Sequence, residues 1–321
     1  MTVTQTVVRE FEVDLVVREA EQVAQDVVAM TLSRPDGDSL PDWTPGAHID
    51  LLLGDGLTRQ YSLCGRTSET DAWRVAVLKA PDSRGGSEAV HDLGTGATVR
   101  VRGPRNHFPV VASKHYLFVA GGIGITPLLA MIYEVEAAGA EWELHYGGRT
   151  RKSMAFVEEL EQFGDRVHVV PEDELGRPDL DAILGEPRPD TLVYTCGPEP
   201  LLAAVESRCG AWPAGSLHLE RFSARKSEEP AEESSFELVL QRSGKTVPVP
   251  SDRSVFEVVR EAGVSVLGSC LEGICGTCET EVVEGDVDHR DSILDDEERA
   301  SNEVMMICVS RCRSARLVLD L

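Results

Sequence analysis

The sequence predicts a multidomain protein: an antiparallel β-barrel, then an α/β domain with a parallel sheet, then a small α+β domain. Residues 1–112 hold short strand-like runs separated by Gly, Pro and Asp, a spacing typical of barrels or sandwiches. Residues 113–223 alternate between buried-strand and helix patterns, which indicates a parallel sheet covered by helices. A charged, apolar-poor linker at 224–235 precedes a cysteine-containing domain at 236–321.

Composition narrows the class of protein. The length of 321 residues favours two or three domains. A formal charge of −24 argues against binding to nucleic acid or to an anionic membrane surface. The chain lacks a long apolar run, and its N-terminus does not resemble a secretion signal. We therefore expect a cytoplasmic protein, with nothing that demands more than a monomer. Its eight cysteines should serve metal binding or catalysis, not four disulfides.

In the barrel, one predicted strand reads RQYSL, residues 59–63. Strand alternation places Arg59, Tyr61 and Leu63 on one face, with Gln60 and Ser62 on the other. A guanidinium group suits a phosphate, and a tyrosine ring suits stacking on a flat heterocycle. An ordinary surface or core strand is the alternative.

A second barrel segment reads SRGGS, residues 83–87. Gly85, Gly86 and Ser87 open a predicted helix, where free N–H groups and a hydroxyl can bind an anion. A plain serine N-cap is the alternative. The presence of both segments in one domain favours binding.

In the α/β domain, a predicted strand runs directly into the glycine-rich segment 121–127 and then into a helix. This is the context of a phosphate-binding loop. A second strand ends in Cys196-Gly197-Pro198. Because ligands bind at the carboxyl ends of parallel strands, both motifs should face one crevice. The alternative for the second motif is a simple strand break.

In the last domain, Cys270, Cys275, Cys278 and Cys308 form a C-x4-C-x2-C pattern with 29 residues before the final cysteine. This is the spacing of plant-type 2Fe-2S ligands. Gly273 and Gly276 would let the backbone wrap around such a cluster. The alternatives are a four-cysteine zinc site and buried free thiols. Among the remaining cysteines, Cys64 and Cys209 should be core residues, and Cys312 is not needed for the set.

Six motifs therefore occur in one order: RQYSL, SRGGS, GGIGITPL, CGPEPLL, ERF and the cysteine pattern. Together they resemble the phthalate dioxygenase reductase / vanillate O-demethylase reductase family of the ferredoxin–NADP reductase superfamily. The resemblance covers nearly the whole chain. It implies a flavin-binding β-barrel, a Rossmann-like nucleotide-binding domain and a β-grasp ferredoxin domain with a 2Fe-2S cluster.

The resemblance also implies FMN, not FAD, and a nicotinamide nucleotide. The candidates for FMN are Arg59, Gln60, Tyr61, Ser62, Leu63, Gly85, Gly86 and Ser87. Those for the nucleotide are Gly121, Gly122, Gly124, Thr126, Pro127, Cys196, Gly197 and Pro198.

Three residues are candidates for a part in electron transfer. Ser62 would hydrogen-bond and tune the flavin, Cys196 would lie by the nicotinamide, and Phe222 would stack near the flavin. A buried structural thiol is the alternative for Cys196, and packing at a domain boundary is the alternative for Phe222.

Arg149 and Arg151 follow the second predicted strand of the α/β domain. An acidic residue near this position favours NAD, whereas an arginine accommodates the 2′-phosphate of NADP. The resemblance favours NADH, and these basic groups keep NADPH open. A solvated basic loop is the alternative.

The expected function is transfer of electrons from NAD(P)H through FMN and the 2Fe-2S cluster to a separate protein. A Rieske-type aromatic-ring or O-demethylating oxygenase is the first expectation, and a cytochrome P450 or other haem protein is the second. The net charge of −8 on residues 236–321 would steer this domain toward a basic partner. A reductase that needs no protein partner stays open as a third possibility, and a metal-stapled interaction module as a fourth.

Overall fold

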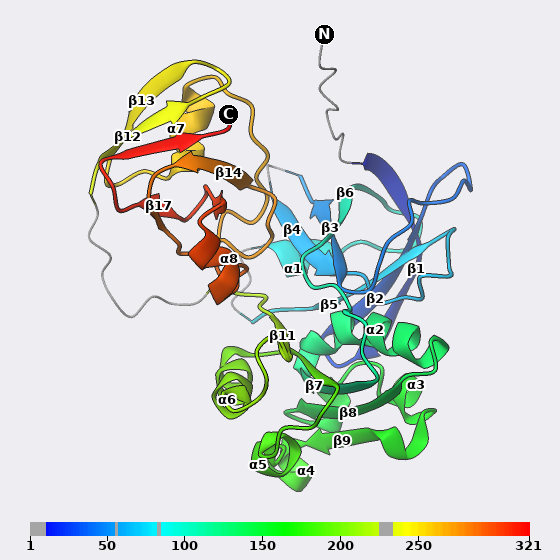
Figure 1. Cartoon of the computed structure of the whole chain (residues 1–321). Coiled ribbons are helices and arrows are strands. Elements are labelled where there is room, and N and C mark those ends of the chain that lie inside the picture. The colour runs from blue at the N-terminus through cyan, green and yellow to red at the C-terminus, as the bar shows by residue number, and fades with distance from the viewer. Residues whose placement is uncertain (1–10, 55–56, 82–84, 225–233) are drawn as a thin grey trace. The chain divides into compact units, whose positions relative to one another are not determined.

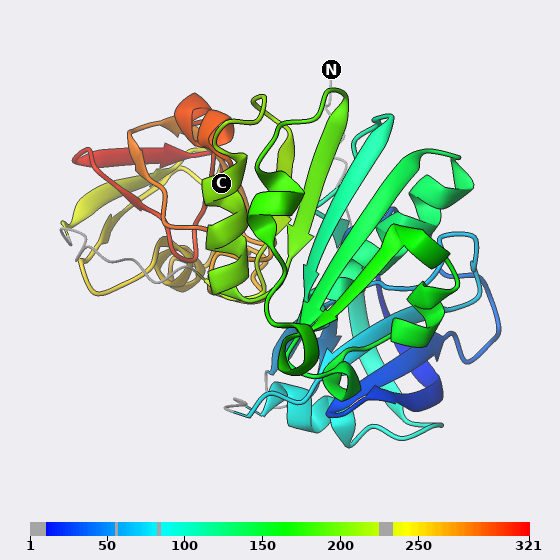
Figure 2. The same ribbon diagram turned by 90° about the horizontal axis from the view of Figure 1, so that it is seen from below.

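The computed structural model describes residues 11–54, 57–81, 85–224 and 234–321, and the chain divides after Glu220 into two compact units (Figures 1 and 2). The expected multidomain class is confirmed, with an antiparallel barrel, a parallel sheet and a ferredoxin-like sheet. The linker expected at 224–235 lies almost wholly outside the described residues. The exact domain boundaries stay a prediction.

The first sheet has six antiparallel strands in the order β4-β3-β6-β1-β2-β5. Its elements are β1 (Glu12–Ala24), β2 (Val27–Ser33), β3 (Ala47–Leu52), β4 (Thr58–Ser62), β5 (Trp73–Leu78), β6 (Thr98–Asn106) and the short helix α1 (Gly86–His91). An isolated bridge between Leu63 and Val75 joins the two edges, so the sheet closes into a barrel. Alternate residues of β5, Trp73, Val75 and Val77, lie in the barrel core.

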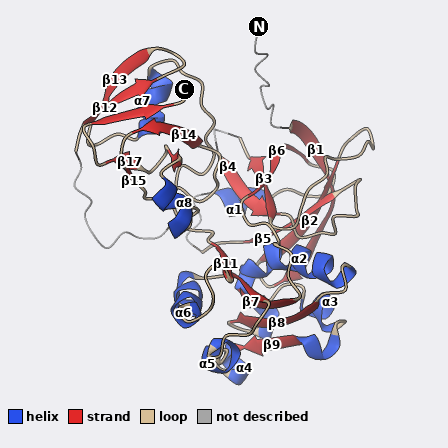
Figure 3. Cartoon of the chain, viewed as in Figure 1, coloured by secondary structure: helices blue, strands red, loops and turns tan. Residues whose placement is uncertain are grey.

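The second sheet has five parallel strands in the order β11-β10-β7-β8-β9, and Figure 3 shows helices around it. Its strands are β7 (His115–Gly121), β8 (Glu141–Gly148), β9 (Val167–Pro171), β10 (Thr191–Cys196) and β11 (Leu217–Glu220). The helices are α2 (Ile125–Ala137), α3 (Val157–Glu161), α4 (Glu172–Leu175), α5 (Leu180–Leu184) and α6 (Glu199–Cys209). The strand order reverses between β7 and β10, where such sheets bind ligands.

The barrel and the parallel sheet share one hydrophobic core. Val27, Ala29 and Ala76 of the barrel belong to the same buried cluster as Phe118 and Leu128 of the α/β part. A separate cluster, which includes Leu117, Ile183 and Val205, fills the other face of the parallel sheet. The shared core explains why residues up to Glu220 form a single compact unit.

The second unit contains a mixed five-stranded sheet in the order β13-β12-β18-β14-β16. Its elements are β12 (Phe236–Leu240), β13 (Lys245–Val249), α7 (Val255–Glu261), β14 (Glu279–Glu284), β15 (Val287–Asp288), α8 (Asp296–Ser301), β16 (Val304–Met306), β17 (Arg311–Cys312) and β18 (Arg316–Leu319). A capping box of Ser254 and Glu257 begins α7, whose Val255, Phe256 and Val259 pack into the core of this unit.

None of the helices in the described part of the chain combines the length and the apolar character that a bilayer crossing requires.

Candidate electron-transfer site

The structure brings together the four cysteines of the predicted cluster. Cys270, Cys275 and Cys278 lie on the loop between α7 and β14, and Cys308 follows β16. Hydrogen bonding to the thiol of Cys275, together with burial, raises the pKa of Cys270. Hydrogen bonding to Cys278, together with burial, raises the pKa of Cys308. The thiols of Cys270 and Cys275 are therefore neighbours, as are those of Cys278 and Cys308. The negative charge of Cys275 also raises the pKa of Cys308. All four are free, so the arrangement fits four thiolate ligands.

The cysteine loop also directs backbone donors at sulfur. The Sγ of Cys270 accepts from the N–H of Glu272 at 3.3 Å, and the Sγ of Cys275 accepts from the N–H of Cys270 at 3.5 Å. Gly273 and Gly276 have φ of 71° and 70°, so both require the left-handed conformation that glycine adopts without strain. Donors aimed at sulfur stabilise negative charge there and tune a cluster's potential.

The remaining cysteines lie elsewhere. Cys312 is buried in β17, and its Sγ is 3.0 Å from the hydroxyl of Ser314. Cys64 and Cys209 are buried in hydrophobic clusters of the first unit. All eight cysteines are free, as expected for thiols that do not form disulfides.

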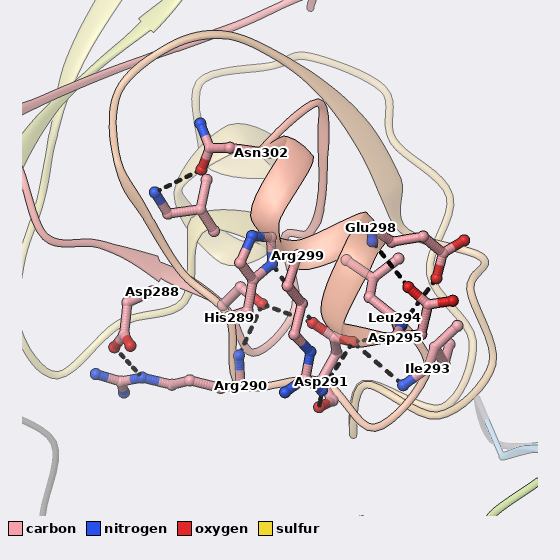
Figure 4. Close-up of polar contacts among 12 residues, drawn as sticks. Asp288, His289, Arg290, Asp291, Ile293, Leu294, Asp295, Glu298, Arg299 and Asn302 are labelled. Atoms are coloured by element: carbon pink, nitrogen blue, oxygen red, sulfur yellow. Dashed lines mark hydrogen bonds and ion pairs between the residues drawn. The ribbon is translucent and has the colours of Figure 1, made fainter. Parts of the chain in front are cut away.

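A buried carboxylate that the sequence did not single out supports the cysteine loop. Asp291 is fully buried, and its Oδ2 accepts from the N–H groups of Ile293 and Leu294 at 3.2 and 2.9 Å (Figure 4). A Cβ on Gly273 would lie 3.0 Å from the Cα of Asp291, and Ser292 donates to the carbonyl of Gly273 at 2.9 Å. The turn that Asp291 organises therefore packs directly against the cysteine loop.

In the barrel, the two predicted flavin segments meet. Arg59 on β4 extends across Gly86, the first residue of α1: a Cβ there would lie 2.6 Å from the Cγ and Nε of Arg59. A side chain at this position would displace the arginine from its place. Gly85 before it has φ 87°, and the hydroxyl of Ser87 accepts from the N–H of Ala80 at 3.1 Å. The arrangement places a guanidinium over the turn that the sequence assigns to a phosphate.

The other residues of the RQYSL strand are hydrogen-bonded or packed into the barrel. Gln60 donates to the buried carboxylate of Asp50 at 3.0 Å. Ser62 and Leu63 are buried where β4 ends, and Tyr61 is half-buried against the barrel core. Burial raises the pKa of Tyr61 to about 12, so its ring stays neutral at physiological pH.

The two nucleotide motifs lie in contact at the switch point of the parallel sheet. A Cβ on Gly124 would lie 2.6 Å from the amide nitrogen of Gly197, and closer still to the carbonyl group of Cys196. A Cβ on Gly121 would lie 2.7 Å from the Cδ of Pro198. Both glycines therefore permit an approach that any side chain would prevent. The two motifs therefore lie side by side, and their role as one nucleotide site stays a prediction.

The glycine turn is further fixed by hydroxyl groups. Thr126, buried in the first turn of α2 beside Pro127, donates to the carbonyl of Ile123 at 2.9 Å. The hydroxyl of Tyr146 on β8 donates to the carbonyl of Gly122 at 3.1 Å. Gly122 has φ 54° and open space where a side chain would be, so its backbone is accessible to a ligand. Sequence reasoning missed Tyr146, because the bond comes from a neighbouring strand.

The two arginines that could contact the 2′-phosphate of NADP have different surroundings. Both follow β8, but Arg151 pairs with Glu161 at 2.8 Å, whereas Arg149 is exposed. Phe222 belongs to the second unit, and its stacking role stays a prediction.

Cys196 has a carboxyl neighbour, Glu220 of the ERF motif, whose proximity the sequence did not indicate. Glu220 on β11 is the register partner of Cys196 on β10. The residue is half-buried, and its Oε2 is buried without a hydrogen-bond partner among the described residues. Burial raises the pKa of Glu220 to about 8, and burial also raises the pKa of Cys196. At neutral pH both groups are therefore uncharged.

Comparison with known proteins agrees with this geometry. The family described as "2Fe-2S iron-sulfur cluster binding domain" matches residues 238–313, and "Oxidoreductase NAD-binding domain" matches residues 118–207. The phenoxybenzoate dioxygenase subunit beta of Ectopseudomonas oleovorans is 44% identical over 93% of this chain and 94% of its own.

Two solved structures are also similar. Phthalate dioxygenase reductase, described as a modular structure for electron transfer from pyridine nucleotides to 2Fe-2S, superposes with a TM-score of 0.71 at 36% identity. That match covers 97% of this chain and 98% of the other. An intact type IV self-sufficient cytochrome P450 monooxygenase gives a TM-score of 0.91 at 46% identity over 97% of this chain. This chain spans only 41% of that longer protein.

We predict that Gly124→Ala impairs nucleotide binding. The added methyl group would collide with the Cys196–Gly197 backbone, and such overpacking costs about 1–3 kcal/mol. Steady-state reduction of ferricyanide should show a KM for NADH raised roughly 10-fold. Gly210→Ala is the control, because its Cβ would meet only the carbonyl oxygen of Ser207 at 3.5 Å. An unchanged KM in Gly124→Ala would remove this crevice as the nucleotide site.

We predict that Asp291→Asn weakens the second unit. Replacing a buried carboxylate that accepts two backbone N–H bonds should lower the free energy of unfolding by about 2 kcal/mol. Thermal melts followed at the visible absorbance of the iron–sulfur cluster should show earlier bleaching. Asp288→Asn is the control, since Asp288 makes a partly exposed ion pair with Arg290. Equal bleaching in both variants would contradict a supporting role for Asp291.

We predict that Glu220 makes stability fall as the pH rises. Because the folded protein holds this proton up to about pH 8 and the unfolded chain releases it near 4.5, stabilisation is complete below 4.5 and is lost between these values. Thermal denaturation from pH 5 to 9 should therefore show a steeper decline for the wild type than for Glu220→Gln. Parallel curves would show that Glu220 is not buried and neutral.

Proposed function

The chain belongs to the phthalate dioxygenase reductase / vanillate O-demethylase reductase family, and from this we propose that it is the NAD(P)H-dependent reductase of an oxygenase system. It would deliver electrons to a separate oxygenase. The observation that carries the proposal is the convergence of four free cysteines in the second unit, after a dinucleotide crevice in the first. One chain thus carries a site for a two-electron donor and a site for a one-electron carrier.

FMN would be held in the barrel. The guanidinium of Arg59 lies over Gly86, so a phosphate at this turn would meet the arginine and the adjoining backbone. Tyr61 offers a neutral ring on the same strand, and Ser62 offers a buried hydroxyl at its end. When bound, FMN supplies the conversion between the two-electron chemistry of nicotinamide and the one-electron chemistry of a 2Fe-2S cluster.

The nicotinamide nucleotide would lie along the crevice of the parallel sheet. The exposed backbone at Gly122 and the glycine turn before α2 suit the pyrophosphate. Cys196 and Glu220, uncharged at neutral pH, would lie beside the Gly197-Pro198 turn without adding a negative charge near a hydride donor. We propose NADH as the donor. The ion pair that engages Arg151 leaves Arg149 as the residue by which NADPH could be accepted.

The cluster would be held by Cys270, Cys275, Cys278 and Cys308 in the second unit. The net charge of −8 on residues 236–321 supports docking on a basic surface of the partner. Relatives named for dioxygenase and monooxygenase systems support a Rieske-type oxygenase as that partner. We further propose that the protein is cytoplasmic and monomeric and binds neither nucleic acid nor membrane. The free cysteines and the charge of −24 support this.

A cytochrome P450 is the second candidate partner. The observation that favours it is the 46% identity to part of a self-sufficient P450 monooxygenase. Reconstitution with each kind of oxygenase under the same salt conditions would distinguish them, because a dedicated reductase should reduce its own partner at least 10-fold faster.

Cys308→Ser tests the electron path. We expect it to abolish the cluster's visible absorbance and the reduction of the oxygenase, while NADH-dependent ferricyanide reduction by the first unit persists. Cys312→Ser is the matched control: Cys312 is a buried thiol four residues away, outside the four-cysteine pattern, and its Sγ lies 3.0 Å from the hydroxyl of Ser314. It should retain both activities. Oxygenase reduction that survives in Cys308→Ser would show that electrons leave the protein without using the cluster.

A further inference from the structure

Three potential metal ligands meet at the edge of the parallel sheet, away from the cysteine loop. Glu143 and His145 lie on β8, and His168 lies on the neighbouring edge strand β9. His145 and His168 are register partners, and Glu143 is two residues before His145. The three side chains therefore project from one face of the sheet.

The sheet register identifies this face. Glu143 and His145 are the partners of Leu117 and Val119 on β7. Those two leucine and valine side chains belong to the buried cluster that includes Ile183 of α5 and Val205 of α6. The same face of the sheet that is apolar over β7 therefore carries these three polar side chains at its edge. They lie within the strands, not on the loops of the two predicted nucleotide motifs.

The three ligand atoms are close enough for one ion. One ligand atom from each residue lies within 4.8 Å of the others, and the Nε2 of His145 is 3.6 Å from the Oε1 of Glu143. The imidazole rings are stacked, with centroids 4.6 Å apart and planes inclined by 19°. His168 is exposed, so its ring can turn toward Glu143 and solvent can reach the group.

One carboxylate oxygen of Glu143 is available for a cation. Arg188 contacts Oε1 at 2.6 Å. No hydrogen bond to Oε2 occurs among the described residues, which leaves an oxygen for an ion that Arg188 does not occupy.

We propose that Glu143, His145 and His168 form a binding site for a divalent transition metal of the zinc class. Two imidazoles and one carboxylate are a ligand set that zinc accepts with a fourth, open position for water. Nitrogen ligands favour zinc, copper and nickel over magnesium and calcium, which prefer oxygen. By joining β8 to the edge strand β9, the ion would fasten the edge of the nucleotide-binding sheet. This site is independent of the 2Fe-2S cluster and of the proposed electron path.

The test uses untagged, oxidised protein with its flavin and cluster in place. Calorimetric titration with Zn²⁺ should show one saturable site, and His168→Ala should weaken it at least about 100-fold, since even the loss of groups that only orient a ligand costs 10–100-fold. His115→Ala is the matched control. His115 also pairs with a glutamate, Glu141, at 3.2 Å, but it lies outside the three-ligand group. Its removal should leave the affinity unchanged.

A second measurement separates this site from the thiols. Electron paramagnetic resonance of bound Cu²⁺ should show nitrogen hyperfine coupling from two imidazoles in the wild type and from one in His145→Ala. The visible absorbance of the cluster should stay constant during the titration. Absence of saturable binding, or an equal affinity in the wild type and His168→Ala, would overturn the proposal. So would zinc uptake that occurs only as the cluster bleaches.

Discussion

The predicted nucleotide site depends on a contact between two stretches of backbone. At Gly124 the turn after β7 approaches the end of β10 so closely that a single Cβ would overlap the carbonyl group of Cys196. This approach fixes where α2 begins relative to the Cys196-Gly197-Pro198 turn. The shared core that joins the parallel sheet to the barrel then relates this site to the Arg59 turn. The relative placement of the nucleotide and flavin segments follows from that packing.

In the second unit, a glycine likewise permits close packing of separate segments around the cysteines. Gly273 adopts a left-handed backbone and packs against Asp291 and Val309, the residue after Cys308. One glycine therefore brings the turn around Asp291 and the strand end that carries Cys308 onto the loop that carries the other three cysteines. Such a loop can hold thiolates at fixed separations only if several contacts constrain the conformation of its backbone. The hydrogen bonds of Asp291 hold its own turn, and that turn reaches the loop through the bond from Ser292 N–H to the Gly273 carbonyl.

The sequence was sufficient for features that are encoded locally. The cysteine spacing, the glycine turn after a buried strand and the RQYSL strand each carry their meaning within a few residues, and their order identified the family. It was not sufficient for residues whose role arises from pairing between distant strands. Glu220 is near Cys196 only because β11 pairs with β10, and His145 meets His168 only through the register of β8 and β9. The ERF motif marked the position of Glu220, but nothing in the local sequence indicates that its carboxyl group lies beside Cys196.

The contrast between two buried carboxylates in the first unit shows what decides their charge. Burial alone would raise the pKa of Asp50, but the nearby Arg105 and hydrogen bonds from Arg105, Gln60 and Arg102 outweigh burial and hold it below its ordinary value. Glu220 is only partly buried as a residue, but its buried Oε2 has no hydrogen-bond partner among the described residues, so burial raises its pKa to about 8. A charged Asp50 braces the barrel beside the Arg59 strand, where arginines can neutralise it. A neutral Glu220 stands beside Cys196, where an added negative charge would oppose the approach of a phosphate-bearing cofactor.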